Sequence, residues 1–425
     1  MNDNGYRMTT LANGVRVVTE SIASVRSAAI GLWVGVGSAH EDPSLRGISH
    51  CIEHMLFKGT PTRSAREIAE LMDSIGGHLN AFTDKESTCY HARVVDAHVP
   101  LAIGVLCDMF VHSIFDPVEL HKEQQVILEE IRMYDDSPDE VSQDLFLKSV
   151  WRGSPLGEPT IGYADTVAAV SREAIAEYMA RQYRAESVVV SAVGNVEHAA
   201  FASEVERLLG SLAPGSGPPD ALAPVFIPAS VVKQKDCEQV YVLVGAEGVS
   251  ARDDRRYTMA VLDTILGGGM ASRLFQEIRE KRGLAYSIYS THNIYRTGGL
   301  FTVAASTRAK NAQEVVGLIR EELRRVAESG VEHDELHRAK EHLKGSLLLS
   351  LESTSTRMLR LGRSVLNLGR NVPIEEITEF IDAVSKDQVD DAARRAFDPH
   401  RLALTVLGPV DDRFETSPDS LAQSA

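Results

Sequence analysis

The sequence has few cysteines and no long apolar run, and these two features limit the classes of protein to which it can belong. Its four cysteines, Cys51, Cys89, Cys107 and Cys237, lack the spacing of a disulfide framework. The polar first ten residues contain no apolar core of a secretion signal. No uninterrupted apolar stretch is long enough to cross a bilayer. We therefore expect a cytoplasmic protein of a reducing compartment, without membrane insertion.

The chain also lacks an excess of positive charge. It has 44 Lys and Arg against 60 Asp and Glu, a formal net charge of −16. Nucleic acids and anionic membranes repel such a surface, so neither is expected as a partner. A hydrophobic content of 44% and a charged content of 24% are typical of folded globular proteins. At 425 residues the chain exceeds one ordinary core and predicts two domains.

A segment rich in proline and glycine, residues 213–228, divides the chain nearly in half. Strand and helix patterns occur on both sides of it. The strand patterns cover residues 15–20, 28–36, 239–244 and 299–306. The helical patterns cover residues 64–75, 98–113, 117–134 and 255–266.

The two halves resemble each other in sequence. Ala-Val-Ser at 169–171 recurs at 383–385, an offset of 214, and Gly194 matches Gly408 at the same offset. One internal duplication explains these matches. We predict an α+β fold of two homologous α+β domains, each a mostly antiparallel sheet packed with helices. The expected parts are domains at 1–212 and 229–412, the linker at 213–228 and a polar tail at 413–425.

The most informative functional motif of the sequence lies at residues 50–54. His50, Glu53 and His54 form the H-x-x-E-H pattern of inverted zinc peptidases. On a helix, residues four apart share a face, so both imidazoles can reach one metal ion, with Glu53 close enough to polarise a water molecule. The matching region of the second half, residues 262–270, has neither histidine nor glutamate. Chemistry kept in one copy is typical of a site rather than of a fold requirement.

A zinc peptidase needs a third protein ligand. Glu123 and Glu130 are seven residues apart and share one face of a predicted helix, so one can bind the metal while the other orients a ligand. Glu129 is an alternative, because the helix register can be misjudged. At an offset of 216 the two carboxylates become Ala339 and Ser346 in the second half.

These motifs resemble the pitrilysin/insulinase family of zinc peptidases, especially its short branch with bacterial homologues and the mitochondrial processing peptidase β subunit. The resemblance extends from Leu11 to Gly408. It implies a zinc metalloendopeptidase with one Zn²⁺ per chain. The family spacing implies that His50, His54 and Glu130 bind the ion, that Glu53 is the general base and that Glu123 orients a ligand.

Two further segments resemble substrate-binding parts of the family. The segment 76–83 resembles its edge strand, which implies that Asn80, Ala81 and Phe82 pair with an extended peptide. Arg279 and Tyr286 resemble a pair that holds substrate and stabilises the oxyanion; Arg282 is an alternative to Arg279.

The resemblance also implies partners. The large family members resemble two such chains fused into a clamshell, so a chain of this length is expected to be one clamshell half and to form a homodimer. The expected substrates are extended peptides or unfolded, presequence-like segments, and the acidic charge favours basic ones. Two alternatives stay open: a processing peptidase that cuts near arginines, and a noncatalytic core or assembly subunit.

Two remaining patterns are read as structure. His333 and His337 are four apart, but Glu335 lies on another side of that helix and no carboxylate pair follows, so we expect a surface helix. The glycines at 267–269 resemble a shorter form of a glycine-rich loop in the processing peptidase's partner subunit. They lack a phosphate-binding pattern, and we expect a hinge or turn.

Overall fold

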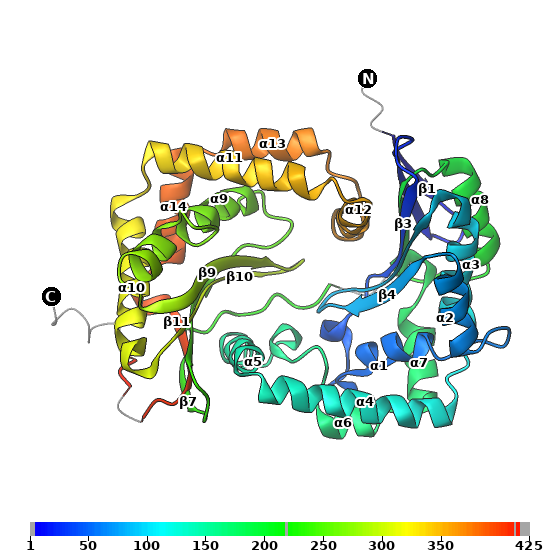
Figure 1. Cartoon of the computed structure of the whole chain (residues 1–425), viewed down its shortest axis with the longest axis horizontal. Helices are drawn as coiled ribbons and strands as arrows, with labels where there is room; N and C mark the ends of the chain where they lie inside the picture. The colour runs from blue at the N-terminus through cyan, green and yellow to red at the C-terminus, as the bar shows by residue number, and fades with distance from the viewer. Residues whose placement is uncertain (1–4, 217–219, 412–413, 417–425) are drawn as a thin grey trace. The chain divides into compact units, whose positions relative to one another are not determined.

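The protein is described by a computed structural model, which covers residues 5–216, 220–411 and 414–416. The chain forms two compact units, each built around its own sheet (Figure 1). The first unit contains Met1–Ile131, Pro159–Asp220 and Leu349–Asn371, and the second contains Arg132–Glu158, Ala221–Leu348 and Val372–Ala425. The predicted α+β fold with two sheets is confirmed.

The first unit has a six-stranded sheet in the order β1-β2-β6-β3-β5-β4. Only β2 and β6 are parallel neighbours; the other neighbouring pairs among the described strands are antiparallel. Its strands are β1 (Tyr6–Thr10), β2 (Arg16–Ser21), β3 (Ser27–Val34), β4 (His78–Thr83), β5 (Thr88–Val95) and β6 (Val188–Gly194).

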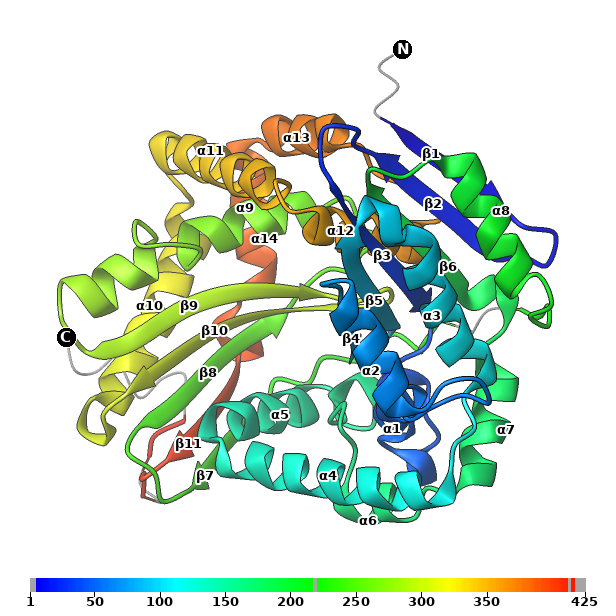
Figure 2. The same ribbon diagram turned by 45° about the vertical axis from the view of Figure 1, so that its right-hand side comes forward.

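The second unit has a five-stranded sheet in the order β7-β11-β8-β10-β9, seen face on in Figure 2. Its one parallel pair among the described strands joins β7 and β11. Its strands are β7 (Ser230–Gln234), β8 (Val240–Glu247), β9 (Ala285–Ile294), β10 (Gly299–Thr307) and β11 (Ala403–Gly408). The order matches that of β2 to β6, as expected for a duplicated unit.

Helices cover the sheets. Those of the first unit are α1 (Ile48–Leu56), α2 (Ala65–Ser74), α3 (Val99–His112), α6 (Ala164–Ala168), α7 (Arg172–Gln182), α8 (His198–Leu209) and α12 (Thr354–Leu368). Those of the second are α5 (Pro138–Val150), α9 (Arg256–Leu266), α10 (Ala312–Ser329), α13 (Ile374–Ala383) and α14 (Lys386–Ala396). The long helices α4 (Pro117–Asp136) and α11 (His333–Ser350) each continue across a boundary between the units.

The duplication is visible in local chemistry. Helices α7 and α14 both have 11 residues, and the hydroxyls of Ser171 and Ser385 cap them by accepting a backbone N–H. The strand that follows each helix ends at Gly194 or Gly408, with φ of 130° and 152°. A side chain there would collide with the neighbouring backbone, so both positions require glycine.

The two halves of the sequence each contribute one helix to the compact unit formed mainly by the other half. Helix α12, from the second half of the sequence, packs on β3 and β6 of the first unit, on the face opposite α3 and α8 (Figure 1). Helix α5, from the first half, packs on β8 and β11 of the second unit. The contiguous domains predicted at 1–212 and 229–412 therefore differ from the compact units. The physical reason is that each sheet has two apolar faces, and the helix that covers the second face comes from the other copy.

Among the described residues, no single helix is long and apolar enough to cross a membrane. One bent pair, Asp96–His112 with Pro117–Asp136, passes that test by length and composition only, with an angle of 101° between its parts.

Candidate metal centre

Helix α1 presents two histidines and a glutamate on one side and a buried apolar side on the other. Ile48, Cys51, Ile52, Met55 and Leu56 face the core. His50, Glu53 and His54 are partly exposed, as the helical spacing predicts.

A buried carboxylate anchors the beginning of this helix. Glu41, 4% exposed, accepts hydrogen bonds from the backbone N–H groups of Gly47 and Ser49, both at 2.8 Å. These are donors that a helix N-terminus leaves without partners. Burial raises the pKa of Glu41 to about 7, against the opposing effect of the two backbone hydrogen bonds.

Three side chains from two helices converge beside α1. Glu130 Oε2 on α4 lies 3.8 Å from His50 Nε2 and 3.7 Å from His54 Nε2. One ligand atom from each residue lies within 4.8 Å of the others, and this is the one such group of histidine, cysteine and carboxylate residues in the part of the chain that the structure describes. Glu129 is exposed and does not belong to this group, so the helix register selects Glu130.

These residues fit a zinc ion. Ligand atoms about 2.1 Å from a tetrahedral zinc ion are roughly 3.4 Å apart, close to the separations found here. Burial, and next the neighbouring His54, lower the pKa of His50 to about 4, so this imidazole is neutral and can bind a metal at neutral pH. Two histidines and one carboxylate leave a fourth position for water or substrate, as in catalytic zinc sites.

Glu123, two turns before Glu130 on α4, is placed to orient His54. Its Oε2 lies 3.0 Å from His54 Nδ1, and its Oε1 lies 2.6 Å from Lys58 Nζ. A carboxylate on Nδ1 favours the tautomer whose Nε2 lone pair faces the Glu130 side. Helix α4 is itself held in place because Gln124 donates to three backbone carbonyls between residues 167 and 170.

Glu53 is held by a residue of the sheet. The Thr83 hydroxyl, at the end of β4, donates a hydrogen bond of 2.6 Å to Glu53 Oε2. Burial raises the pKa of Glu53, and the Thr83 hydrogen bond opposes that effect. Because Glu53 lies on the same face as the histidines, a water molecule between them is within reach of its carboxylate.

The predicted substrate segment is an edge strand. Strand β4 pairs with β5 on one side and is the last strand of the described sheet. Asn80 is exposed, and its side chain accepts a hydrogen bond from the N–H of Ala81 at 2.8 Å. The Phe82 ring packs edge-on against Trp33 at 5.7 Å.

Arg279 and Tyr286 lie in the second unit. Arg279 belongs to a π-helical segment, Phe275–Glu280, and its guanidinium lies 4.6 Å from the centre of the Phe275 ring. Tyr286 is 78% exposed near the start of β9. Arg282 is paired with Glu277 at 2.8 Å. Because Arg282 is held in that pair, Arg279 is the better candidate of the two arginines.

Sequence reasoning missed three residues of this site: Glu41, Lys58 and the role of Thr83. Glu41 and Lys58 are close to the histidines in sequence, but their partners are set by packing. The one signal available in the sequence was an acidic residue, Glu41, shortly before the N-terminus of a predicted helix.

This arrangement defines a class: an α+β peptidase with an H-x-x-E-H helix and a third ligand from a second helix. Residues 16–163 match the family model described as Insulinase (Peptidase family M16), and residues 169–343 match the one described as Peptidase M16 inactive domain. The chain belongs to the insulinase family, peptidase family M16, and the resemblance seen in the sequence is confirmed.

Curated relatives agree over nearly the whole chain. An uncharacterized zinc protease of Bacillus subtilis is 43% identical over 400 residues, 94% of this chain and 97% of the relative. An uncharacterized zinc protease of Streptomyces coelicolor is 42% identical over 417 residues, 96% of this chain and 90% of the relative.

A solved structure has the same fold. The crystal structure of a protease from Helicobacter pylori superposes with a TM-score of 0.88 at 21% identity, over 95% of this chain and 99% of the other. At this identity the likeness concerns the fold alone.

Proposed function

We propose that this chain is a zinc metalloendopeptidase with one Zn²⁺ held by His50, His54 and Glu130. The observation that carries the proposal is the convergence of these three side chains beside Glu53, with ligand atoms within 4.8 Å. The insulinase-family membership and the zinc proteases among the relatives support it.

The zinc ion, when bound, supplies Lewis acidity that polarises the scissile carbonyl and lowers the pKa of the attacking water. Glu53 takes the proton of that water and then delivers it to the leaving amine, as general base and then general acid. Thr83 holds the Glu53 carboxylate in one orientation through its 2.6 Å hydrogen bond. Glu123 holds His54 from the other side.

The proposed substrate is an extended peptide or an unfolded segment that adds a strand to the free edge of β4. Main-chain hydrogen bonds accept many sequences, and the position of β4 at the edge of the described sheet supports this mode. Tyr286 or Arg279 is proposed to stabilise the tetrahedral oxyanion, a role worth a few kcal/mol in other enzymes.

A processing preference for basic residues has one supporting observation. Helix α5 carries Asp139, Glu140 and Asp144, and burial, followed by the two neighbouring aspartates, raises the pKa of Glu140. Such a cluster attracts a cationic side chain. Mapping cut positions across a peptide library tests it, and cuts without enrichment of basic residues contradict it.

The decisive variant is Glu53→Gln. It keeps size and packing but cannot accept a proton, so we expect peptide hydrolysis to fall at least 100-fold while one zinc per chain is retained. Zinc content by atomic emission and hydrolysis of a quenched fluorescent peptide measure the two effects.

Glu129→Gln is the matched control, because this exposed glutamate lies beside Glu130 on the same helix. It should keep wild-type activity. Full activity in Glu53→Gln would sink the mechanism. A wild-type protein that binds zinc but hydrolyses no peptide would favour the noncatalytic subunit.

A further inference from the structure

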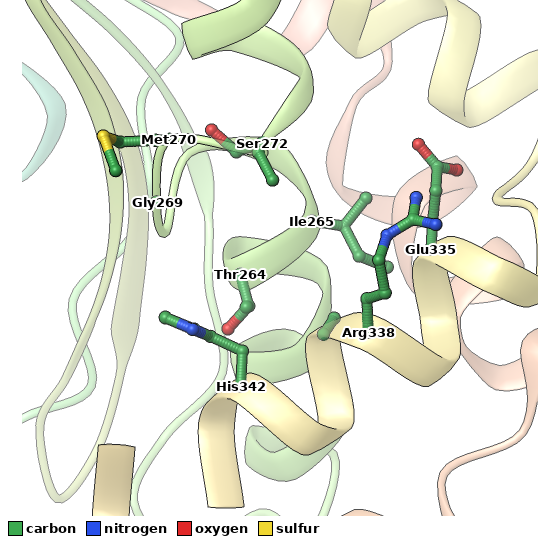
Figure 3. Close-up of a pocket in the computed structure, with 10 residues that line it drawn as sticks. Thr264, Ile265, Gly269, Met270, Ser272, Glu335, Arg338 and His342 are labelled. Carbon is green, nitrogen blue, oxygen red and sulfur yellow. The ribbon is translucent and has the colours of Figure 1, made fainter. Parts of the chain in front are cut away.

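The second unit has a pocket where the first unit has its metal centre. The pocket lies between α9 and α11, the counterparts of α1 and α4, and its volume is about 380 Å³ (Figure 3). Helix α11 begins 216 residues after α4, and at that offset Ala339, which lines the pocket, replaces the buried Glu123. The volume is typical of small-ligand sites.

The lining combines an apolar floor with a few polar groups. Ile265, Ala271 and Ala339 supply apolar surface. Ser272 is 4% exposed, and its buried hydroxyl has no hydrogen-bond partner among the described residues. A buried hydroxyl without a partner is costly, but protein atoms enclose this one, so it is not among the groups that a ligand in the pocket contacts.

A cation at the pocket is available to a ligand. Arg338 lies near Glu335, but the Glu335 carboxylate is already held by Arg273 through two hydrogen bonds, of 2.6 and 2.8 Å. Arg338 itself makes no ion pair within 4 Å among the described residues and is exposed at the pocket rim. An arginine in this state is suited to a carboxylate.

A further polar group of the lining is His342, which extends from α11 toward the glycine segment after α9 (Figure 3). A side chain added at Gly269 would meet only the His342 ring, at 3.8 and 3.9 Å. One added carbon would therefore be in ordinary van der Waals contact with the ring, and a larger side chain at Gly269 would displace His342 or occupy the pocket.

We propose that this pocket binds the C-terminal residue of a peptide, with its α-carboxylate on Arg338 and an apolar side chain against Ile265 and Ala339. A peptide end held here would restrict which bonds of a bound peptide can be cut. That consequence rests on the proposed peptidase function, whereas the binding itself does not.

The experiment measures binding to the full chain carrying Glu53→Gln, so that peptides are not consumed. A peptide labelled at its N-terminus and ending in leucine is compared as the free acid and as the C-terminal amide by fluorescence anisotropy. We expect the acid to bind at least tenfold more tightly, because the amide loses the charge-assisted contact. Adding Arg338→Gln should abolish the difference, while His337→Gln, an exposed neighbour outside the pocket, should keep it.

A second variant tests the cavity independently of charge. Gly269→Leu should fill the space toward His342 and weaken the acid at least tenfold. Equal binding of acid and amide to the parent chain overturns the proposal, as does a difference that survives Arg338→Gln. N-acetyl-leucine and an unlabelled peptide acid are then compared as competitors of the labelled peptide. Competition by N-acetyl-leucine that is tenfold weaker supports a peptide end as the ligand. Equal competition by the two overturns the proposal. If the protein binds the acid selectively but hydrolyses no peptide, the proposed binding site is supported and only the proposed peptidase activity is contradicted.

Discussion

At the residue scale, other side chains hold the proposed metal ligands and the proposed base in place. Glu123 orients His54, Lys58 pairs with Glu123, and Thr83 holds Glu53. Each contact fixes a rotamer of a partly exposed group, so that less reorganisation is needed when substrate reacts.

Replacing Thr83 by valine tests this for the base. Thr83→Val keeps the shape of the side chain but removes the donor to Glu53, so we expect kcat to fall about tenfold with zinc content unchanged. Steady-state kinetics on a peptide substrate measure it. Thr83→Ser restores a hydroxyl and should recover most of the rate; equal loss in both variants would contradict a role through the hydrogen bond.

The buried Glu41 predicts a pH effect on stability. Its pKa is about 7 in the folded chain against an ordinary value of 4.5, so between these pH values the unfolded chain releases a proton that the folded chain keeps. This stabilisation is fully present below pH 4.5 and is lost as pH rises through 7, a change of up to about 3 kcal/mol at roughly 1.4 kcal/mol per pH unit.

Glu41→Gln removes this titration. Urea unfolding of the zinc-free proteins should therefore show wild type losing stability relative to Glu41→Gln between pH 4.5 and pH 8. A stability difference that is the same at both pH values would exclude the assigned pKa.

At the element scale, the first unit depends on close approach of α12 to the sheet. A side chain at Gly362 on α12 would overlap the indole of Trp33, which is fully buried. On the sheet, a side chain at Gly31 would meet Met358 of the same helix. Small residues on both surfaces allow the backbone of α12 to sit close to the sheet.

Gly362→Ala should therefore destabilise the protein by about 1–3 kcal/mol, because an added methyl group in a packed interior forces neighbouring groups apart. Gly104→Ala is the control, since this glycine of α3 in the same unit has open space around its added carbon. That substitution should stabilise by up to about 1 kcal/mol through helix propensity. Denaturant unfolding measures both, and destabilisation of similar size in the two variants would argue against the close approach.

At the scale of the whole molecule, the proposed homodimer makes a prediction of its own. If Tyr286 of one chain serves the metal centre of another, Glu53→Gln and Tyr286→Phe should complement each other. After subunit exchange, half of the dimers are mixed and each has one intact site, so activity should return to about a quarter of wild type. Light scattering gives the mass. A monomeric mass, or a mixture no more active than the two separate variants, contradicts the homodimer with shared sites.

Much of the candidate site is predictable from sequence because its signals are local. The spacing of His50, Glu53 and His54 places them on one helical face wherever that helix lies. The offset of 214 residues predicted two related sheets, and their strand orders agree. The choice between Glu129 and Glu130 was open, because a register error of one residue turns a side chain by about 100°.

The sequence by itself determined the H-x-x-E-H helix, the duplicated α+β plan and the absence of its histidines and carboxylates from the second copy. Only the tertiary structure decided that Glu130 meets the histidines, that Thr83 and Lys58 support them, and that α5 and α12 each cover the sheet of the other copy. The physical reason is that helix periodicity depends on neighbours in sequence. Contacts between helices and sheets depend on which apolar faces pack together, and sequence distance does not encode that.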